Sequence, residues 1–154
     1  MKTEDFIFLD PGRLVDGDLA LVLVKEIPGN REKELLAAYD FEMRLVETGE
    51  KIGHMNIRIG NIDKIVRLSG HIGYDVDPGH RGHRYAARSC RLLFPLAKRH
   101  GMNTLWITCS PDNIASRITC ERAGGKLVEI VDLPEENDMY KAGDRQKCRY
   151  RVDL

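Results

Sequence analysis

The sequence VDPGHRGHRYA, residues 76–86, decides how this chain folds. It follows a segment with strand-like alternation, residues 69–77, which stops at Pro78-Gly79. It leads into the strongest helical pattern of the chain, residues 82–100, where apolar side chains recur every three or four positions. The sequence therefore predicts a strand, a tight loop and a helix in direct succession.

The start of this predicted helix has the properties of an anion site. The first N–H groups of a helix have no partner within the helix, and the helix dipole adds positive potential there. Gly82 lets a ligand approach the backbone closely, Ala86 is nearly as small, and Arg81, His83 and Arg84 add charge. The pattern is neither a Walker loop nor a three-glycine dinucleotide motif, and it suits the binding of a pyrophosphate.

Outward from this unit, the chain alternates between strands and helices. The alternation of apolar and polar residues predicts strands at 19–27, 41–45, 51–59, 69–77, 103–109, 126–132 and 146–152. Helices are predicted at 31–39, 82–100 and 112–123, and a loop at 60–68. This order implies a mixed α/β or α+β fold, with about six or seven strands flanked by helices.

Composition excludes several classes of protein. The chain has 154 residues, which predicts a single domain over 1–154, and its 24 basic and 24 acidic residues give a net charge of zero. Neutrality gives no support for nucleic-acid or membrane-surface binding. The acidic start does not resemble a signal peptide, and no apolar run is long enough to span a membrane. We expect a cytoplasmic protein with no nucleic-acid or membrane partner.

The four cysteines do not form a metal or disulfide pattern. Cys90, Cys109, Cys120 and Cys148 contain no CxxC pair and no zinc-ribbon spacing, so we interpret all four as free thiols. His80 and His83 lie three residues apart but have no nearby cysteine or carboxylate of a ligand set, so no metal is predicted.

A second motif lies in the predicted helix at 112–123. Residues 113–125 read NIASRITCERAGG. This segment resembles the N-x-x-S/A-x-x-x-Y-E-K-x-G-F segment of GNAT-superfamily N-acetyltransferases, and residues 76–86 resemble the acetyl-CoA loop of that family, [Q/R]-x-x-G-x-[G/A] after a strand. One helix and one strand separate the two motifs, as in the family. The resemblance is firm over 69–130 and extends more loosely over 41–154.

The resemblance implies a GNAT fold whose strands at 69–77 and 103–109 splay apart, with acetyl-CoA as co-substrate. The pantetheine arm would lie in the gap, bonded to the backbone near Asp75 and Val76. The remaining residues implied to bind the coenzyme are Arg81, Gly82, His83, Arg84, Tyr85, Ala86, Asn113 and Ser116. The implied reaction is direct attack of a substrate amine on the acetyl thioester.

The chain departs from the family pattern at three places. Arg84 stands where the family has its middle glycine, and Cys120 stands where the family often has the tyrosine that protonates the leaving thiolate. Cys120 is the candidate acid, although a coenzyme thiolate can also leave unassisted. Only 13 residues separate Ile27 from Phe41, which leaves room for one helix where the family usually has two.

A general base must take a proton from the attacking ammonium group. The first candidate is His71, on the strand expected to run beside the thioester, because histidine titrates near neutral pH. His54 and Glu42, on the neighbouring predicted strands, are alternatives.

The acceptor is expected to be a primary amine of a small molecule or peptide. An acidic loop at 132–144 would attract a cation to a site that, in the family, borders the acceptor. Two other hypotheses stay open: an acyl-CoA-binding sensor or interaction module of the same fold, and a phosphate-binding protein outside the family. The sequence also leaves a homodimer open.

Overall fold

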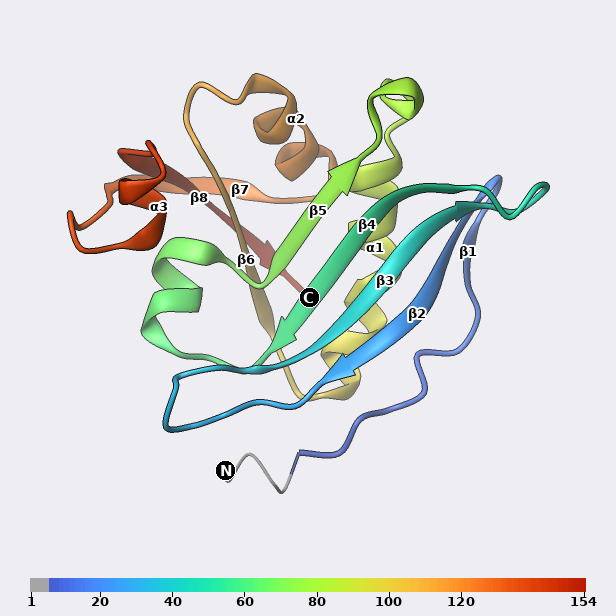
Figure 1. The fold of residues 1–154 in the computed structure, drawn as a ribbon, viewed down its shortest axis with the longest axis horizontal. Coiled ribbons are helices and arrows are strands. Elements are labelled where there is room, and N and C mark those ends of the chain that lie inside the picture. Colours follow the sequence, from blue (N-terminus) through green and yellow to red (C-terminus); the bar gives the residue numbers. More distant parts are fainter. Residues whose placement is uncertain (1–5) are drawn as a thin grey trace.

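A computed structural model gives the structure of residues 6–154. Residues 1–5, part of the acidic start compared above with a signal peptide, lie outside the described residues. The described chain forms two antiparallel sheets (Figure 1). The first sheet has the order β1-β2-β3-β4-β5 and the second has the order β6-β8-β7. The strands are β1 (Leu14–Asp16), β2 (Leu19–Ile27), β3 (Ala37–Leu45), β4 (Lys51–Ile59), β5 (Ile72–Val76), β6 (Thr104–Cys109), β7 (Lys126–Asp132) and β8 (Gln146–Asp153).

Short and long helical segments connect these strands. They are a π-helical turn (Ile65–Ser69), a 3-10 turn (Pro78–His80), α1 (Tyr85–Arg99), α2 (Ile114–Arg122) and α3 (Asp138–Lys141). Helix α1 packs on the first sheet through a stripe that includes Cys90, Leu93 and Leu96, all nearly fully buried. Gly101, at φ +84°, follows α1 in the left-handed conformation that commonly ends a helix, as its position predicts.

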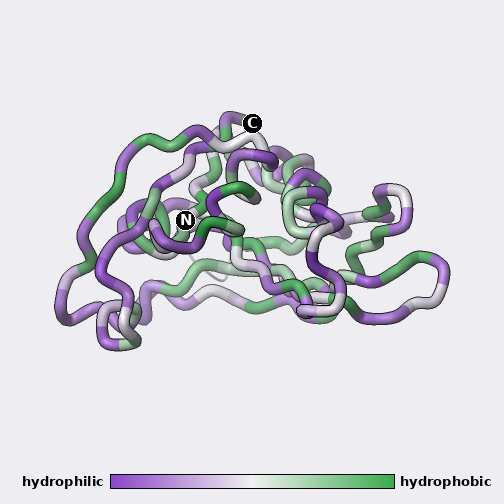
Figure 2. The backbone as a smooth tube through the Cα atoms, turned by 90° about the horizontal axis from the view of Figure 1, so that it is seen from above, coloured by the Kyte–Doolittle hydropathy of each residue, from purple (hydrophilic) through white to green (hydrophobic). Residues whose placement is uncertain are grey.

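The core lies between α1 and one face of the first sheet. Along β3, Tyr39, Phe41 and Met43 are buried and alternate with the half-buried polar residues Asp40 and Glu42. Figure 2 shows the same alternation of hydrophobic and hydrophilic positions along much of the chain. No helix among residues 6–154 is long and apolar enough to cross a membrane.

The two sheets meet where β5 and β6 lie side by side. At the start of β5, the His71 N–H donates to the Trp106 carbonyl at 2.7 Å. Beyond this point the strands diverge, so β5 is the edge of one sheet and β6 the edge of the other (Figure 1). The predicted splay between these strands is therefore confirmed. We call the His71–Trp106 contact the closed end of the seam and the divergent side, near Tyr74 and α2, its open end.

Several predicted boundaries differ from the structure. No helix forms at 31–39, because Asn30 and Leu35 pair as an isolated bridge and a turn connects them. Ala37 already belongs to β3, where pairing with β2 and β4 outweighs local helix propensity. The loop predicted at 60–68 contains most of the π-helical turn, and β5 is shorter than the predicted 69–77 strand. Strand β1 was not predicted.

Candidate active site

A groove of about 470 Å³ lies at the open end of the seam, between β5, the loop that follows it, the start of α1 and α2. It brings together nine of the ten residues predicted to bind the coenzyme: Asp75, Val76, Arg81, Gly82, Arg84, Tyr85, Ala86, Asn113 and Ser116. The tenth, His83, belongs to the same loop but does not line the groove, and its ring packs 5.2 Å from the ring of Tyr85. Two segments about 30 positions apart thus face one another across a single groove.

The backbone of the loop explains why its sequence is unusual. Gly82 has φ +94°, a conformation that residues with a side chain rarely adopt, and a Cβ added there would meet no atom within 4 Å. Arg84, the residue before α1, has φ +62° in the left-handed region. This is the position where the family pattern has glycine, and the backbone keeps a conformation that a glycine would adopt without strain.

The groove is electropositive. No side chain caps the N-terminus of α1, so the N–H groups of its first turn are free to bind an anion. Three arginines line the groove, Arg81, Arg84 and Arg122, against a single aspartate, Asp75. The Arg81 guanidinium donates to the Val76 carbonyl at 3.1 Å, which holds that side chain along the loop.

Helix α2 supplies the opposite wall. Asn113 begins this helix by accepting a hydrogen bond from the Ser116 N–H at 3.1 Å, the capping role expected of asparagine. The Ser116 hydroxyl lies 2.5 Å from the hydroxyl of Tyr74 on β5. This contact joins β5 to α2 at the open end of the seam. Burial of the Tyr74 hydroxyl raises its pKa well above the usual value for tyrosine.

Cys120 lies one turn of α2 further on and does not line the groove. Its side chain is fully buried, and its thiol is hydrogen-bonded with Cys109, which raises the pKa of Cys120. All four cysteines are free and buried. In this arrangement the Cys120 thiol has no open path to a leaving group in the groove, so its predicted role as the acid has no structural support.

His71 sits at the closed end, and all of its polar atoms are engaged. Its Nδ1 accepts from the Trp106 N–H at 2.9 Å, so Nε2 carries the ring proton and donates to the Gly60 carbonyl at 2.8 Å. The residue is 0% exposed, and burial lowers its pKa. A general base needs a free lone pair facing the substrate, and neither ring nitrogen of His71 offers one.

The alternative bases lie on the outer face of the first sheet, away from α1. His54 on β4 pairs with Glu42 on one side and with Asp75, a groove residue, on the other. Its ring is partly exposed and lies 3.7 Å from the Asp40 carboxylate. Glu42 is bound by Arg44, so its carboxylate is already occupied.

The acidic loop contains α3 and lies beside the end of β6. The Ser110 hydroxyl donates to Asp144 at 2.9 Å, and Lys147 lies 3.3 Å from the same carboxylate. The first of these contacts and, to a smaller extent, the second hold the pKa of Asp144 below its usual value. A small polar pocket separates Asp112 from Asp144 and Arg145.

Six residues that line the groove were not predicted as site residues: Tyr74, His80, Ala115, Ile118, Thr119 and Arg122. Thr119 and Arg122 follow Ser116 at intervals of three, the spacing that keeps residues on one helix face, so helical periodicity was a usable signal. Nothing in the sequence links Tyr74 to Ser116, 42 positions away.

Comparisons with known proteins agree with this geometry. The model of the acetyltransferase (GNAT) domain family matches residues 22–126. A comparison with curated protein sequences gave no match.

Three solved structures illustrate the similarity in fold. RimL, a ribosomal L7/L12 alpha-N-protein acetyltransferase, is 22% identical, with a TM-score of 0.59 over 76% of this chain and 70% of its own. An acetyltransferase from Agrobacterium tumefaciens str. C58 is 28% identical, with a TM-score of 0.56 over 76% of this chain and 61% of its own. The microcin C7 self immunity acetyltransferase MccE, solved with acetyl-CoA and AMP, is 17% identical, with a TM-score of 0.58 over 81% of this chain and 64% of its own. RimL has also been solved in complex with coenzyme A.

Proposed function

Because this chain belongs to the GNAT acetyltransferase domain family, we propose that it transfers an acetyl group from acetyl-CoA to a primary amine of a peptide or small molecule. The observation that carries the proposal is the groove at the open end of the seam. It unites a glycine-containing loop, an uncapped helix start and three arginines with the wall of α2. Membership of the family rules out the phosphate-binding protein outside the family.

The residues present fit a coenzyme A group. A pyrophosphate is satisfied by several N–H donors and by arginine, and the start of α1 with Arg81 and Arg84 offers both. The edge of β5 that faces the groove is not paired with a further strand, so it can bond the amide groups of a pantetheine arm. MccE and RimL, named above, bind acetyl-CoA and coenzyme A.

The hydroxyl pair Tyr74–Ser116 is the proposed donor to the leaving thiolate. When the amine nitrogen bonds to the acetyl carbon and the carbon–sulfur bond breaks, the thiolate must be stabilised. Both residues line the groove and their hydroxyls lie 2.5 Å apart, so Ser116 can donate a hydrogen bond to the sulfur while Tyr74, which its raised pKa keeps protonated, donates one to Ser116. This assignment replaces the role predicted for Cys120 with groups that reach the groove.

His54 is the proposed base. Unlike His71 it has an exposed ring, and it is the cross-strand neighbour of Asp75, which lines the groove. The Asp40 carboxylate lies 3.7 Å from the Nε2 of His54. His54 does not itself line the groove, so the proton lost by the substrate ammonium would reach it through water.

A peptide amine is the favoured acceptor class. RimL is named as an acetyltransferase of a protein amino terminus, and the acidic loop of this chain can attract a cationic amine. The family relation and the loop charge support this choice together; a small-molecule amine is the second acceptor class.

The experiment is a thiol-release assay with acetyl-CoA and a panel of amino-terminal peptides and small amines. We expect turnover with at least one amine. Ser116→Ala should lower kcat by about tenfold to a hundredfold, because one hydrogen-bond donor to the thiolate is removed. Turnover that is undiminished in Ser116→Ala would overturn the assignment of this donor.

One observation favours a second function, an acyl-CoA-binding sensor. The thiol that replaces the family's tyrosine is buried away from the groove. Tight binding of acetyl-CoA without turnover on any amine would support the sensor. Absence of binding would overturn both functions.

A further inference from the structure

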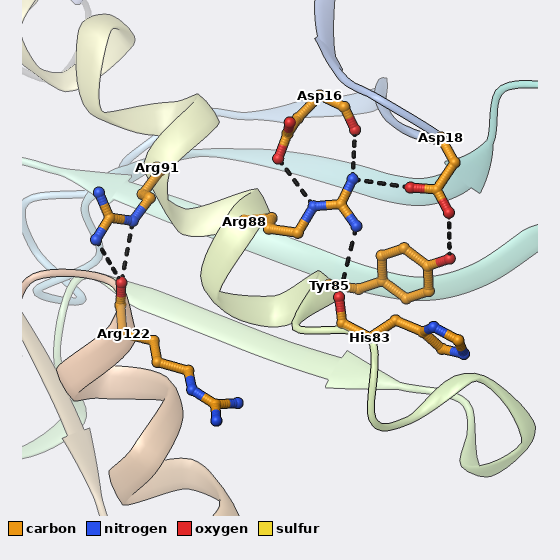
Figure 3. A network of polar contacts seen from close by, with 7 residues as sticks. All are labelled: Asp16, Asp18, His83, Tyr85, Arg88, Arg91 and Arg122. Atoms are coloured by element: carbon orange, nitrogen blue, oxygen red, sulfur yellow. Dashed lines mark hydrogen bonds and ion pairs between the residues drawn. The ribbon is translucent and has the colours of Figure 1, made fainter.

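The first turn of α1 is tied to the turn between β1 and β2. Arg88 donates from Nε to the Asp16 carboxylate at 2.8 Å and from Nη2 to the Asp16 carbonyl at 2.5 Å. The same Nη2 donates to the Asp18 carboxylate at 2.8 Å. Figure 3 shows the guanidinium of Arg88 enclosed between the two aspartates. One arginine thus holds a turn that lies about 70 positions away in the sequence.

The same network reaches the loop that lines the groove. Arg88 donates from Nη1 to the His83 carbonyl at 3.5 Å, on the side away from the aspartates (Figure 3). Tyr85, the first residue of α1, donates its hydroxyl to the other oxygen of Asp18 at 2.7 Å. The two contacts hold His83 and Tyr85, which flank Arg84 in its left-handed conformation.

We expect these ties to contribute modestly to stability. The Arg88 side chain is 25% exposed, but Asp16 and Asp18 are 49% and 60% exposed, and solvent-exposed ion pairs contribute little to the free energy of unfolding. Their geometric effect is larger, because Arg84 is strained and α1 lacks a capping side chain. Without the ties, the loop between Gly82 and Ala86 would sample conformations whose N–H groups do not converge on one anion.

We propose that Asp16 and Asp18 are positioning residues for the coenzyme: acting through Arg88 and Tyr85, they hold the pyrophosphate loop in its binding conformation. The inference rests on the proposed function, since it assigns the anion bound by this loop to coenzyme A. Neither aspartate lines the groove. Their effect on affinity is therefore indirect, through the fraction of molecules whose loop is competent to bind.

Electrostatics alone predicts the opposite effect. The network holds two carboxylates and one guanidinium close to a site for a polyanion. Removal of a negative charge at Asp16 or Asp18 should tighten the binding of an anion if charge were all that mattered. The positioning role predicts weaker binding, so the sign of the change in Kd separates the two effects.

The test compares the wild-type protein with Asp16→Asn/Asp18→Asn by calorimetric titration of acetyl-CoA. We expect Kd to rise about fivefold, as the competent fraction of the loop falls, while kcat at saturating acetyl-CoA stays unchanged. Tyr85→Phe, which removes only the bond to Asp18, should give a smaller rise in Kd. Hydrogen–deuterium exchange of the amides at 82–88, without ligand, should be faster in the double variant.

Arg99→Gln is the matched control. Arg99 also ties α1 to a distant backbone carbonyl, that of Asp10 at 3.0 Å, but at the opposite end of the helix. The two arginines are 11 residues apart, roughly 16 Å along the axis and beyond the screening length at physiological salt. This variant should leave Kd and exchange at 82–88 unchanged.

An unchanged or lower Kd in the double variant, or unchanged exchange at 82–88, would overturn the inference. A wild-type protein that binds no acetyl-CoA would overturn the proposed function. In that case, exchange at 82–88 alone would decide whether the two aspartates position the loop.

Discussion

The two ends of the β5–β6 seam differ sharply although His71 and Tyr74, which mark them, lie only three positions apart. At the closed end, the backbone and ring of His71 satisfy the carbonyl and N–H of Trp106 and bond the two sheets together. At the open end, Tyr74 lines a groove, and its hydroxyl bonds Ser116 of α2. The seam thus closes where a side chain bridges the strands, and it opens where polar groups are left for a ligand.

This difference gives His71 a structural role and Tyr74 a place in the candidate active site, although the two residues look similar in the sequence. His71 and Tyr74 lie on one short segment, and both carry ionisable side chains beside a predicted active site. Burial and hydrogen-bond partners give them different roles: His71 joins the sheets, and Tyr74 lines the groove. The predictions below test that division of roles.

The largest expected change is in the free energy of unfolding, when His71 at the closed end of the seam is replaced. His71→Ala leaves the Trp106 N–H and the Gly60 carbonyl without their partners and creates a cavity, so it should lower the free energy of unfolding by about 3–5 kcal/mol. Urea denaturation measures this change. His54→Ala, on the exposed face of β4, is the control and should change stability little. If His71→Ala instead kept full stability and lost only the rate, the original prediction of a general base would be supported.

A smaller effect is expected in how the free energy of unfolding depends on pH. Burial lowers the pKa of His71 in the folded protein below its value near 6.5 in the unfolded chain, so the fold favours the neutral ring. The stability that this residue contributes is present above about pH 6.5 and is lost as pH falls through the lowered pKa. Denaturation curves between pH 8 and pH 5 should show this loss in the wild-type protein.

His71→Ala should have a flatter dependence of stability on pH. Some slope should remain, because burial lowers the pKa of His100 in the same direction. Identical slopes in the two proteins would show that His71 is not held neutral by the fold.

The smallest expected changes, in stability and in affinity for acetyl-CoA, concern Arg84 at the open end of the seam. Arg84→Gly relieves a left-handed backbone, which outweighs the greater freedom of glycine in the unfolded chain, and should raise stability by about 0.5 kcal/mol. The same change removes a guanidinium from the groove, so the Kd for acetyl-CoA should rise roughly threefold or more. Thermal melts and calorimetry measure the two quantities.

Glu34→Gly is the matched control for this variant. Glu34 is the other described non-glycine residue with positive φ, at +53°, and it does not line the groove. It should gain comparable stability and keep the wild-type Kd. A loss of affinity in both variants would show that glycine itself, rather than the missing charge, weakens binding.

Most residues of the groove at the open end could be predicted from the sequence, because those of its anion site lie close together in the chain. The order of strand end, loop and helix start over residues 76–86 follows from local signals, although Tyr85 and Arg88 also bond the distant Asp18 and Asp16. The second motif begins α2 through the side chain of Asn113. The strands at 19–27, 51–59 and 126–132 were also predicted with their observed bounds. Their side chains alternate or form continuous apolar runs, which are local signals as well.

The rest depends on contacts between distant residues. The helix predicted at 31–39 does not form, because Ala38 and Tyr39 pair with both β2 and β4 and Ala37 pairs with β4. Strand β1 has three residues and exists through its pairing with β2 and the bonds of Asp16 to Arg88. The roles of His71 and Tyr74 follow from partners 35 and 42 positions away, which no local pattern encodes.

The most direct test of the central claim, that the open end of the seam holds acetyl-CoA, is calorimetric titration of acetyl-CoA into the wild-type protein and Gly82→Trp. Gly82 lines the groove, whereas Gly124 has a similar φ of +98° and open space around it but does not line the groove, so Gly124→Trp is the control for backbone strain. We expect one molecule to bind the wild-type protein and Gly124→Trp alike, and binding to be lost in Gly82→Trp with its fold retained by thermal melt. Equal affinity in Gly82→Trp and the wild-type protein would contradict the claim.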